Sequence, residues 1–301
     1  KMLLSNLSLF LNIVEKGSLS AAGREAGLSP TSVSERLAAL EAHFGVVLLN
    51  RTTRSISLTD EGRQLIDGAK QVLGEVHDLE TRIRYGAQSL SGLIRLSVPN
   101  DTGRQIVSAE LAQFVDENPN IDIDLMLSDG YVDIVGQGVD IALRFGRITD
   151  SSLRVRPLGL TRRIICASPE YLAKHGTPKT PSDLKNHNCL IMRFGPNLDN
   201  LWRFGPDGTK QIVTVRGNRI ANDGGLVRQW ALDGYGIVWK AELDVGEDIR
   251  AGRLVEVLGD YASPPTPLQM LFPPSRTQPH RVKVLADRLT KVLRAGLLHE
   301  E

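Results

Sequence analysis

The sequence contains few cysteines and aromatic residues, and neither sign of charge is in excess. Two cysteines among 301 residues cannot form a disulfide framework, which excludes the small secreted proteins that depend on one. The 36 Lys and Arg residues balance the 35 Asp and Glu residues, so any nucleic-acid contact must come from a local basic patch. No apolar run approaches the roughly 20 residues of a membrane span, and no signal-peptide pattern is seen. We therefore expect a cytoplasmic protein that contacts no membrane.

Motifs for catalysis, metal binding and cofactor binding are also missing. The six histidines do not cluster with the cysteines at metal-ligand spacing. Neither a G-x-x-x-x-G-K-[ST] phosphate loop nor a G-x-S-x-G nucleophile elbow occurs. We expect no enzyme, no metal and no cofactor. The composition, 41% hydrophobic and 24% charged, is that of a globular protein, and the length allows two domains.

Three short helices are predicted in the first 45 residues. Apolar residues recur at spacings of three and four, and the helices end in turn at Gly17, Gly27 and Gly45. The predicted inner faces are Leu3, Leu7, Phe10, Leu11 and Val14 in the first helix, and Leu19, Ala22 and Ala26 in the second. Ser18 can cap the second helix, and Ser29 the third, which has Pro30 at its first position. Two short helices joined by a tight glycine turn are typical of a helix-turn-helix, although an ordinary three-helix core would show the same pattern.

The third helix presents polar residues away from its apolar stripe of Val33, Leu37 and Leu40. Short polar side chains near a helix N-terminus suit a helix that enters the major groove end-on. The residues predicted to contact DNA from this helix are Ser29, Pro30, Thr31, Ser32, Ser34, Glu35 and Arg36.

Two short strands are predicted next, over residues 46–49 and 55–58. The tip between them resembles the wing of a winged helix, from which Arg51, Thr53 and Arg54 can reach phosphates or the minor groove. Residues 1–58 carry six basic and four acidic side chains, a net charge of +2. Since this charge is small, tight binding to DNA needs at least two copies of the domain.

A long amphipathic helix is predicted next, with Thr59 as its N-cap. Its apolar residues keep heptad spacing over nearly three heptads, and charged residues lie on both sides of them. The apolar residues are Leu65, Ala69, Val72, Val76, Leu79 and Ile83. A helix lying on its own domain would show the same stripe. The length and the charged flanks favour a homodimer through residues 60–90, which end in a small, polar hinge.

These residues carry a family resemblance. The N-terminal segment resembles a LysR-type transcriptional regulator at Phe10, Val14, Gly17-Ser18, Ala21-Ala22, Leu28-Ser29, Val33-Ser34, Leu37, Leu40-Glu41, Phe44-Gly45, Leu48, Arg51-Thr52-Thr53-Arg54, Leu58-Thr59 and Gly62. The resemblance extends over essentially the whole chain. It departs at Gly23, where alanine is usual, and at Asn50, where phenylalanine is common.

Residues 91–301 alternate between short apolar strands and amphipathic helices, which favours an α/β domain with a parallel sheet. A short helix is expected over residues 131–137. The resemblance implies a winged helix-turn-helix over 1–59, a linker helix over 60–90, and an effector domain similar to periplasmic solute-binding proteins. Its two subdomains would cover about 92–160 with 268–298, and about 161–267. The resemblance further implies a homotetramer and makes RNA polymerase a candidate partner.

Ligands of open α/β sheets bind where strands end and helices begin, which indicates several effector contacts. Backbone N–H groups at Asn100-Asp101-Thr102 could hold a carboxylate, although the charge of Asp101 opposes an anion. Arginines could pair with a carboxylate or form a structural ion pair. The candidates are Asn100, Asp101, Thr102, Arg144, Phe145, Gly146, Arg193, Phe194, Asn222 and Asp223, of which family position favours Asn100, Thr102, Phe145 and Arg193.

Three functions stay open. The sequence favours a DNA-binding regulator of double-stranded DNA controlled by a small-molecule effector. A thiol-switched regulator using Cys166 and Cys189 is a second hypothesis, weakened because Cys166 lies in an apolar run. The third is a small-molecule receptor or enzyme whose first ninety residues form an oligomerisation arm. Such an arm would not require the arginine-bearing wing.

Overall fold

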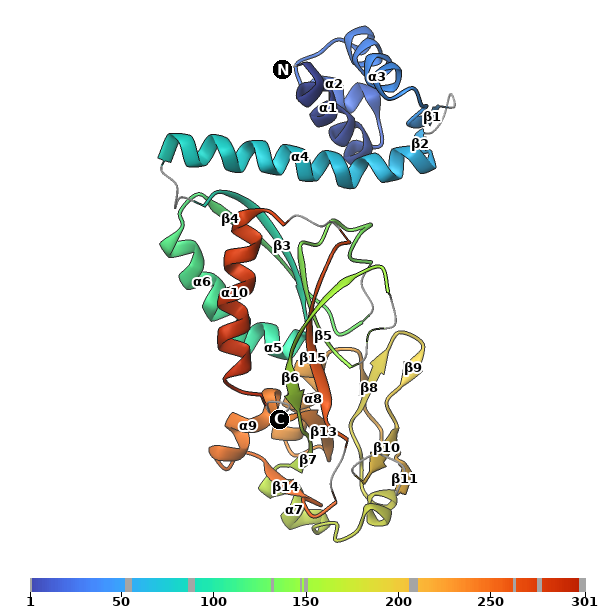
Figure 1. Ribbon diagram of the computed structural model, residues 1–301. Helices are drawn as coiled ribbons and strands as arrows, with labels where there is room; N and C mark the ends of the chain where they lie inside the picture. The colour runs from blue at the N-terminus through green and yellow to red at the C-terminus, as the bar shows by residue number, and fades with distance from the viewer. Residues whose placement is uncertain are drawn as a thin grey trace. The chain divides into compact units, whose positions relative to one another are not determined.

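The computed structural model forms two compact units (Figure 1). The first comprises Lys1–Gly92 with Thr277–Arg281, and the second comprises Leu93–Arg276 with Val282–Glu301. The structure describes residues 2–51, 56–85, 90–130, 133–146, 148, 151–205, 211–261, 264–274 and 278–297.

The first unit is mostly helical. Its elements are α1 (Met2–Lys16), α2 (Leu19–Glu25), α3 (Pro30–Phe44), β1 (Leu49–Arg51), β2 (Ile56–Leu58) and α4 (Asp60–Tyr85). Side-chain caps start two of the helices as the sequence predicts: Ser18 accepts from the Ala21 N–H (3.3 Å) and Ser29 accepts from the Ser32 N–H (3.2 Å). Gly45, at φ 70°, ends α3 in the left-handed conformation that favours glycine.

The core of this unit confirms the predicted inner face of α3, because Val33, Leu37 and Leu40 are buried. The predicted face of α1 is partly wrong: Leu3 is exposed, whereas Leu9 and Ile13 are buried. On α2, Ala22 is buried but Ala26 is exposed. The helix packs so closely that a Cβ at Gly23 would lie 3.0 Å from both the Leu28 carbonyl oxygen and Val33 Cγ2, which explains the glycine.

The first strand of the hairpin begins later than expected. Residues 46–48 lie outside any strand, and β1 starts at Leu49, pairing antiparallel with β2. Val46 and Val47 are exposed, so the apolar run alone was not enough to predict where the strand begins. The apolar side chains that do enter the core here are Leu48 and Leu49.

The apolar stripe of α4 divides into two parts. Ala69 is buried in the core of the first unit, with Leu65, Ile66 and Leu73 packed beside it. Of the other residues in the predicted stripe, Val76 is half-buried, whereas Val72, Leu79 and Ile83 are exposed by 45%, 50% and 75%. The core of the unit thus covers part of the predicted apolar stripe, and the exposed residues of the stripe can contact another surface.

The second unit is α/β and begins with a mixed sheet. The elements around it are β3 (Gly92–Val98), α5 (Asn100–Thr102), the π-helix η1 (Gly103–Val107), α6 (Ser108–Glu117), β4 (Ile121–Leu127), β5 (Ile141–Phe145), β6 (Arg154–Thr161), β15 (Thr266–Phe272) and α10 (His280–Arg294).

The strand order of this sheet is β4-β3-β5-β15-β6. The expectation of a parallel sheet holds for β3 and β5, but β15 runs antiparallel to both β5 and β6. The reason is that β15 returns late in the chain from the other half of the unit. Helices α6 and α10 lie side by side along the sheet (Figure 1), joined by Arg288, which donates to Glu110 and Glu117.

The other half of the unit holds smaller sheets. Its elements are β7 (Arg163–Ala167), α7 (Pro169–His175), the 3-10 helix η2 (Pro181–Asn186), β8 (Ile191–Phe194), β9 (Asn197–Leu198), β10 (Leu201–Phe204), β11 (Gln211–Thr214), β12 (Ile220–Ala221), α8 (Gly224–Leu232), β13 (Val238–Ala241), α9 (Glu242–Arg250) and β14 (Val255–Val257).

The continuous apolar run of β7 is buried on both faces, as expected of a central strand. Ile164 and Cys166 pack into one cluster, whereas Ile165 and Ala167 pack into another with Trp202 and Trp239. Strands β13 and β14 flank β7, both antiparallel, and β12 pairs parallel with β8. The predicted helix over 131–137 is wrong within the described residues, because residues 134–138 form turns.

Candidate functional site

The N-terminal end of α3 presents the polar surface that the sequence predicts. Ser29 both accepts from the Ser32 N–H and donates its hydroxyl to Ser32 Oγ (3.0 Å). Thr31 and Glu35 are exposed, while Val33 beneath them is buried. Ser29 and Ser32 thus fix the first turn of α3 and leave the outer face of this helix accessible.

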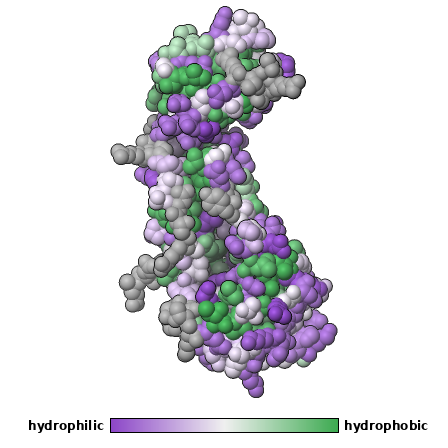
Figure 2. All heavy atoms as spheres, turned by 90° about the vertical axis from the view of Figure 1, so that its right-hand side faces the viewer, coloured by the Kyte–Doolittle hydropathy of each residue, from purple (hydrophilic) through white to green (hydrophobic). Residues whose placement is uncertain are grey.

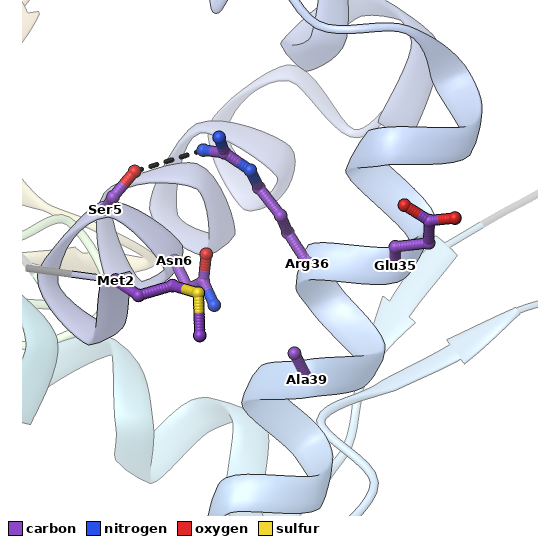
Figure 3. A pocket seen from close by; sticks show the side chains of 6 residues that line it. All are labelled: Met2, Ser5, Asn6, Glu35, Arg36 and Ala39. Atoms are coloured by element: carbon purple, nitrogen blue, oxygen red, sulfur yellow. Dashed lines mark hydrogen bonds between the residues drawn. The ribbon is translucent and has the colours of Figure 1, made fainter.

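Arg36 is held by a residue that the sequence analysis did not single out. Its guanidinium donates to Ser5 Oγ of α1 at 3.1 Å. Figure 3 shows Arg36 reaching from α3 toward Ser5, beside Met2 and Asn6. These side chains line an open hollow of about 430 Å³. Position on the helix predicts that Arg36 points outward, but only the packing of α1 against α3 shows that it reaches another helix.

The hairpin is attached to the helices by two polar side chains. Glu41 Oε1 accepts from the Leu48 N–H (2.9 Å), and Thr59 Oγ1 donates to the Val47 carbonyl oxygen (2.7 Å). Thr59 also accepts from the Gly62 N–H (2.9 Å), confirming it as the cap of α4. Arg51 ends β1, and its side chain, like Thr53 and Arg54, lies outside the described residues.

The predicted effector residues Asn100, Asp101 and Thr102 form α5, directly after β3, and all three are buried. The Asn100 backbone N–H donates to Asp129 Oδ1 (2.9 Å), and its side-chain amide donates to Asp129 Oδ2 (3.0 Å). The Gly224 N–H, which opens α8 in the other half of the unit, also donates to Asp129 Oδ2 (2.6 Å). One carboxylate therefore joins two helix N-termini from the two subdomains; we call this place the subdomain junction.

A second link across the junction connects Arg104 and Asp223 at 3.3 Å. Asp223 caps α8 by accepting from the Leu226 N–H (3.0 Å). Burial acts to raise the pKa of Asp223, but the N–H of Leu226 and the guanidinium of Arg104 outweigh it and lower that pKa below its usual value. Asp223, a predicted effector residue, is thus already engaged by protein groups.

A buried lysine lies behind the junction. Lys240 Nζ is 3.0 Å from Asp101 Oδ2, 3.1 Å from Asp244 Oδ2 and 3.3 Å from the Gly224 carbonyl oxygen. Thr102 donates its hydroxyl to Asp244 Oδ1 (2.8 Å). Burial acts to lower the pKa of Lys240, yet the two carboxylates hold it at about 12. Lys240, Asp244 and Asp129 were missed because their contacts with Asp101, Thr102, Asn100 and Gly224 join residues far apart in the chain, and such contacts leave no local pattern.

Arg144 lies on a neighbouring strand, β5, and is held by neutral partners. Its guanidinium donates to the Ser97 carbonyl oxygen (3.1 Å) and to Ser97 Oγ (2.7 Å). Burial lowers the pKa of Arg144, against the effect of the Asp129 charge. Phe145 and Gly146 follow it and are half-buried, and the Gly146 N–H donates to the Pro267 carbonyl oxygen.

Three other predicted effector residues are exposed. Arg193 and Phe194 lie in the β8–β9 hairpin, and Asn222 precedes α8. Within the described part of the chain, no hydrogen bond or ion pair joins these side chains to Asp129, Asp101 or Lys240. Their role in binding an effector stays a prediction.

The two cysteines lack the properties of a redox pair. Burial raises the pKa of both thiols to about 12, so the reactive thiolate is scarce at neutral pH. Cys166 and Cys189 also belong to different hydrophobic clusters, on opposite faces of β7. The described residues contain no group of three or more His, Cys, Asp and Glu side chains placed to hold a metal ion. None of their helices is long and apolar enough to cross a bilayer.

Comparison with known proteins decides the family. Residues 4–63 match the model of the bacterial regulatory helix-turn-helix protein of the lysR family, and residues 87–294 match the LysR substrate binding domain. The chain belongs to the LysR family. The regulator is 34% identical to the transcriptional regulator DmlR of Escherichia coli over 87% of this chain and 85% of DmlR. It is also 34% identical to CrgA of Neisseria meningitidis over 95% of this chain and 96% of CrgA.

Solved structures agree with this assignment. The CrgA structure covers 95% of this chain and 97% of its own, with a TM-score of 0.62 and 33% identity. The full-length Vibrio cholerae virulence activator AphB covers 96% of this chain and 98% of its own, with a TM-score of 0.59 and 28% identity. The protein is therefore a DNA-binding transcriptional regulator with an effector-binding domain of two α/β subdomains. Its relatives are regulators rather than enzymes.

Proposed function

We propose that the regulator reads bases with the N-terminal half of α3 and positions the hairpin on the DNA backbone. The exposed, serine-capped start of α3 over a buried apolar face is the observation that carries this proposal. Its residues are those predicted from the sequence, Ser29 to Ser32, Ser34, Glu35 and Arg36, with Arg51, Thr53 and Arg54 on the hairpin. Short polar groups at a helix N-terminus suit a recognition helix that enters the major groove end-on.

The proposed active form contains at least two chains paired through α4. The exposed apolar residues Val72, Leu79 and Ile83 support this pairing, because exposed residues at heptad spacing lose contact with water when a second helix covers them. The local net charge of +2 on residues 1–58 also calls for two copies of the DNA-binding unit.

Further assembly into a homotetramer is proposed through the effector domains. Exposed apolar side chains occur on β8 to β12, at Phe194, Leu198, Leu201, Ile212 and Ile220. Figure 2 shows apolar surface on the side of the molecule where β8 to β11 lie. Exposed apolar patches of this kind are typical of interaction surfaces. An effector bound between the subdomains would then change the bend of the DNA, and RNA polymerase is the candidate partner that reads the change.

Fluorescence anisotropy with DNA from the regulator's own upstream region tests the DNA contacts. Replacing Arg54 with alanine should weaken binding to every DNA sequence and reduce the salt slope by about 1 for each copy. Ser34→Ala should instead change the preference between specific and random DNA. Lys174→Ala, on an exposed residue of the effector domain, is the control. An unchanged salt slope for Arg54→Ala, or an equal loss on both DNAs for Ser34→Ala, would refute the assignment of that residue.

Sedimentation tests the dimer. Ile83→Asp places a charge on the exposed apolar face of α4 and should shift the regulator toward monomers, with weaker DNA binding as the consequence. Glu80→Gln, at an exposed residue of the same helix, should leave the mass unchanged. If Ile83→Asp sediments as wild type does, the chains pair elsewhere.

A further inference from the structure

The junction between the subdomains contains an anion that belongs to the chain itself. Asp129 follows β4, and its carboxylate accepts three hydrogen bonds: from the Asn100 backbone, the Asn100 side chain and the Gly224 backbone. Asn100 opens the helical segment that continues through α6, and Gly224 opens α8. The carboxylate thus lies where two helix N-termini converge, the arrangement in which proteins bind anionic ligands.

We propose that Asp129 is a built-in anionic ligand of the effector domain, which holds the two subdomains together before any effector binds. The same carboxylate fills the position that a carboxylate group of an effector would take. The first statement rests on the contacts of Asp129 alone, and the second also rests on the proposed function, which places the effector between the subdomains.

The space around Asp129 supports this role. A Cβ at Gly224 would lie 3.2 Å from Asp129 Oδ2 and 2.8 Å from Lys240 Nζ, so a side chain at that position would require both groups to shift. Asn100 and Gly224 are buried, which makes an unpaired N–H in their place costly. Because Asp129 supplies these acceptors, its removal leaves donors from both subdomains without a partner.

Other contacts across the junction differ in their protection from water. Thr102 and Asp244 are buried, and so is Lys240 between its two carboxylates. The Arg104 side chain is 53% exposed, so its pair with Asp223 is weakened by water and salt. Another carboxylate can replace the one of Asp129, since the backbone N–H groups that it accepts from bind any such oxygen.

The proposal predicts which ligands the wild-type junction rejects. A small carboxylate in solution must compete with a tethered one, whose effective concentration is on the order of millimolar or higher. Simple monocarboxylates should therefore fail to occupy the wild-type junction. An effector that does occupy it must displace Asp129 and offset that loss by further contacts.

Chemical rescue by formate tests the proposal on the full-length protein. In Asp129→Ala, formate should fill the vacated position and raise the Tm by about 2–4 °C, saturably, relative to chloride at equal ionic strength. Wild type should not respond. The matched control is Asp124→Ala, which removes a half-exposed carboxylate of β4 that pairs only with Arg95 among the described residues. An equal response of wild type or Asp124→Ala to formate, or none from Asp129→Ala, overturns the proposal.

If Asp129→Ala does not fold, amide hydrogen exchange of a second variant, Asp129→Asn, tests the proposal. Asp129→Asn preserves the shape of the side chain but removes its charge and one acceptor. The amides of Asn100 and Gly224 should exchange faster in this variant than in wild type, whereas amides in β7 should not change. Equal protection of both amides in the two proteins contradicts the role of Asp129.

DNA binding by the same preparations distinguishes a failure of the proposed function from a failure of the inference about Asp129. If wild type shows no preference for specific DNA, the proposed function fails, while formate rescue can still establish the link between the subdomains. If wild type binds DNA selectively and Asp129→Ala ignores formate, only the inference about Asp129 fails.

Discussion

The DNA-binding unit and the effector domain place their polar groups in opposite ways. In the DNA-binding unit, the hydroxyl and charged side chains at the start of α3 face outward over the apolar Val33 and Leu37. In the effector domain, Lys240, Asp244 and Asp101 are 7%, 5% and 3% exposed. Exposed groups can exchange water for DNA at little cost, whereas buried ones must keep their partners. The first arrangement suits recognition, and the second suits a defined geometry between subdomains.

The largest effect is expected from removing the buried cation. Lys240→Met leaves Asp101 and Asp244 facing each other without their shared partner, and should destabilise the effector domain by about 3–5 kcal/mol. Urea unfolding followed separately for each unit measures this loss. The exposed control Lys174→Ala should change stability by less than about 0.5 kcal/mol. A loss of similar size in both variants would mean that burial of Lys240 is not the cause.

The stability of the effector domain should also depend on pH through Lys240. The folded-state pKa of Lys240, about 12, lies above its ordinary 10.5, so folding holds this proton more tightly. The resulting stabilisation is complete below about pH 10.5 and is lost as the pH rises toward 12. The difference in unfolding free energy between wild type and Lys240→Met should shrink over this interval. A constant difference would contradict the raised pKa.

A smaller effect is expected from glycines within one helix of the DNA-binding unit. A Cβ at Gly62 would lie 2.2 Å from the Leu48 carbonyl oxygen, so Gly62→Ala should destabilise the unit by about 1–3 kcal/mol. Gly68 on the same helix is exposed and has nothing within 4 Å of its Cβ position, so Gly68→Ala should stabilise by up to about 1 kcal/mol. Thermal unfolding measures both changes in stability. If both substitutions stabilise the unit, helix propensity alone explains the changes.

The smallest effect is expected from the thiols. Cys166 and Cys189 are buried and their pKa values are raised to about 12, so a thiol reagent at neutral pH should modify neither in the folded protein and both after unfolding. Mass spectrometry of the labelled protein reads this directly. Rapid labelling of the folded protein would revive the thiol-switch hypothesis.

Local features were predictable because their causes lie within a few residues. Ser29 and Thr59 cap their helices as expected, and the face of Val33, Leu37 and Leu40 is buried. The strand over 46–49 and the helix over 131–137 were misplaced, since an apolar or mixed run does not specify which partner it packs against. The exact domain boundaries, the DNA-contacting residues and the effector residues remain predictions.

The amino-acid sequence was enough to indicate the family and its two-domain order through a resemblance, and to predict the capped helices, because capping and turn chemistry act within a few residues. The folded chain was needed to show that Arg36 reaches Ser5, that the stripe of α4 is partly covered, and that Lys240 and Asp129 bind groups up to 139 and 95 residues away. Such contacts depend on which ends of strands and helices the fold brings together. No local pattern in the chain encodes that proximity.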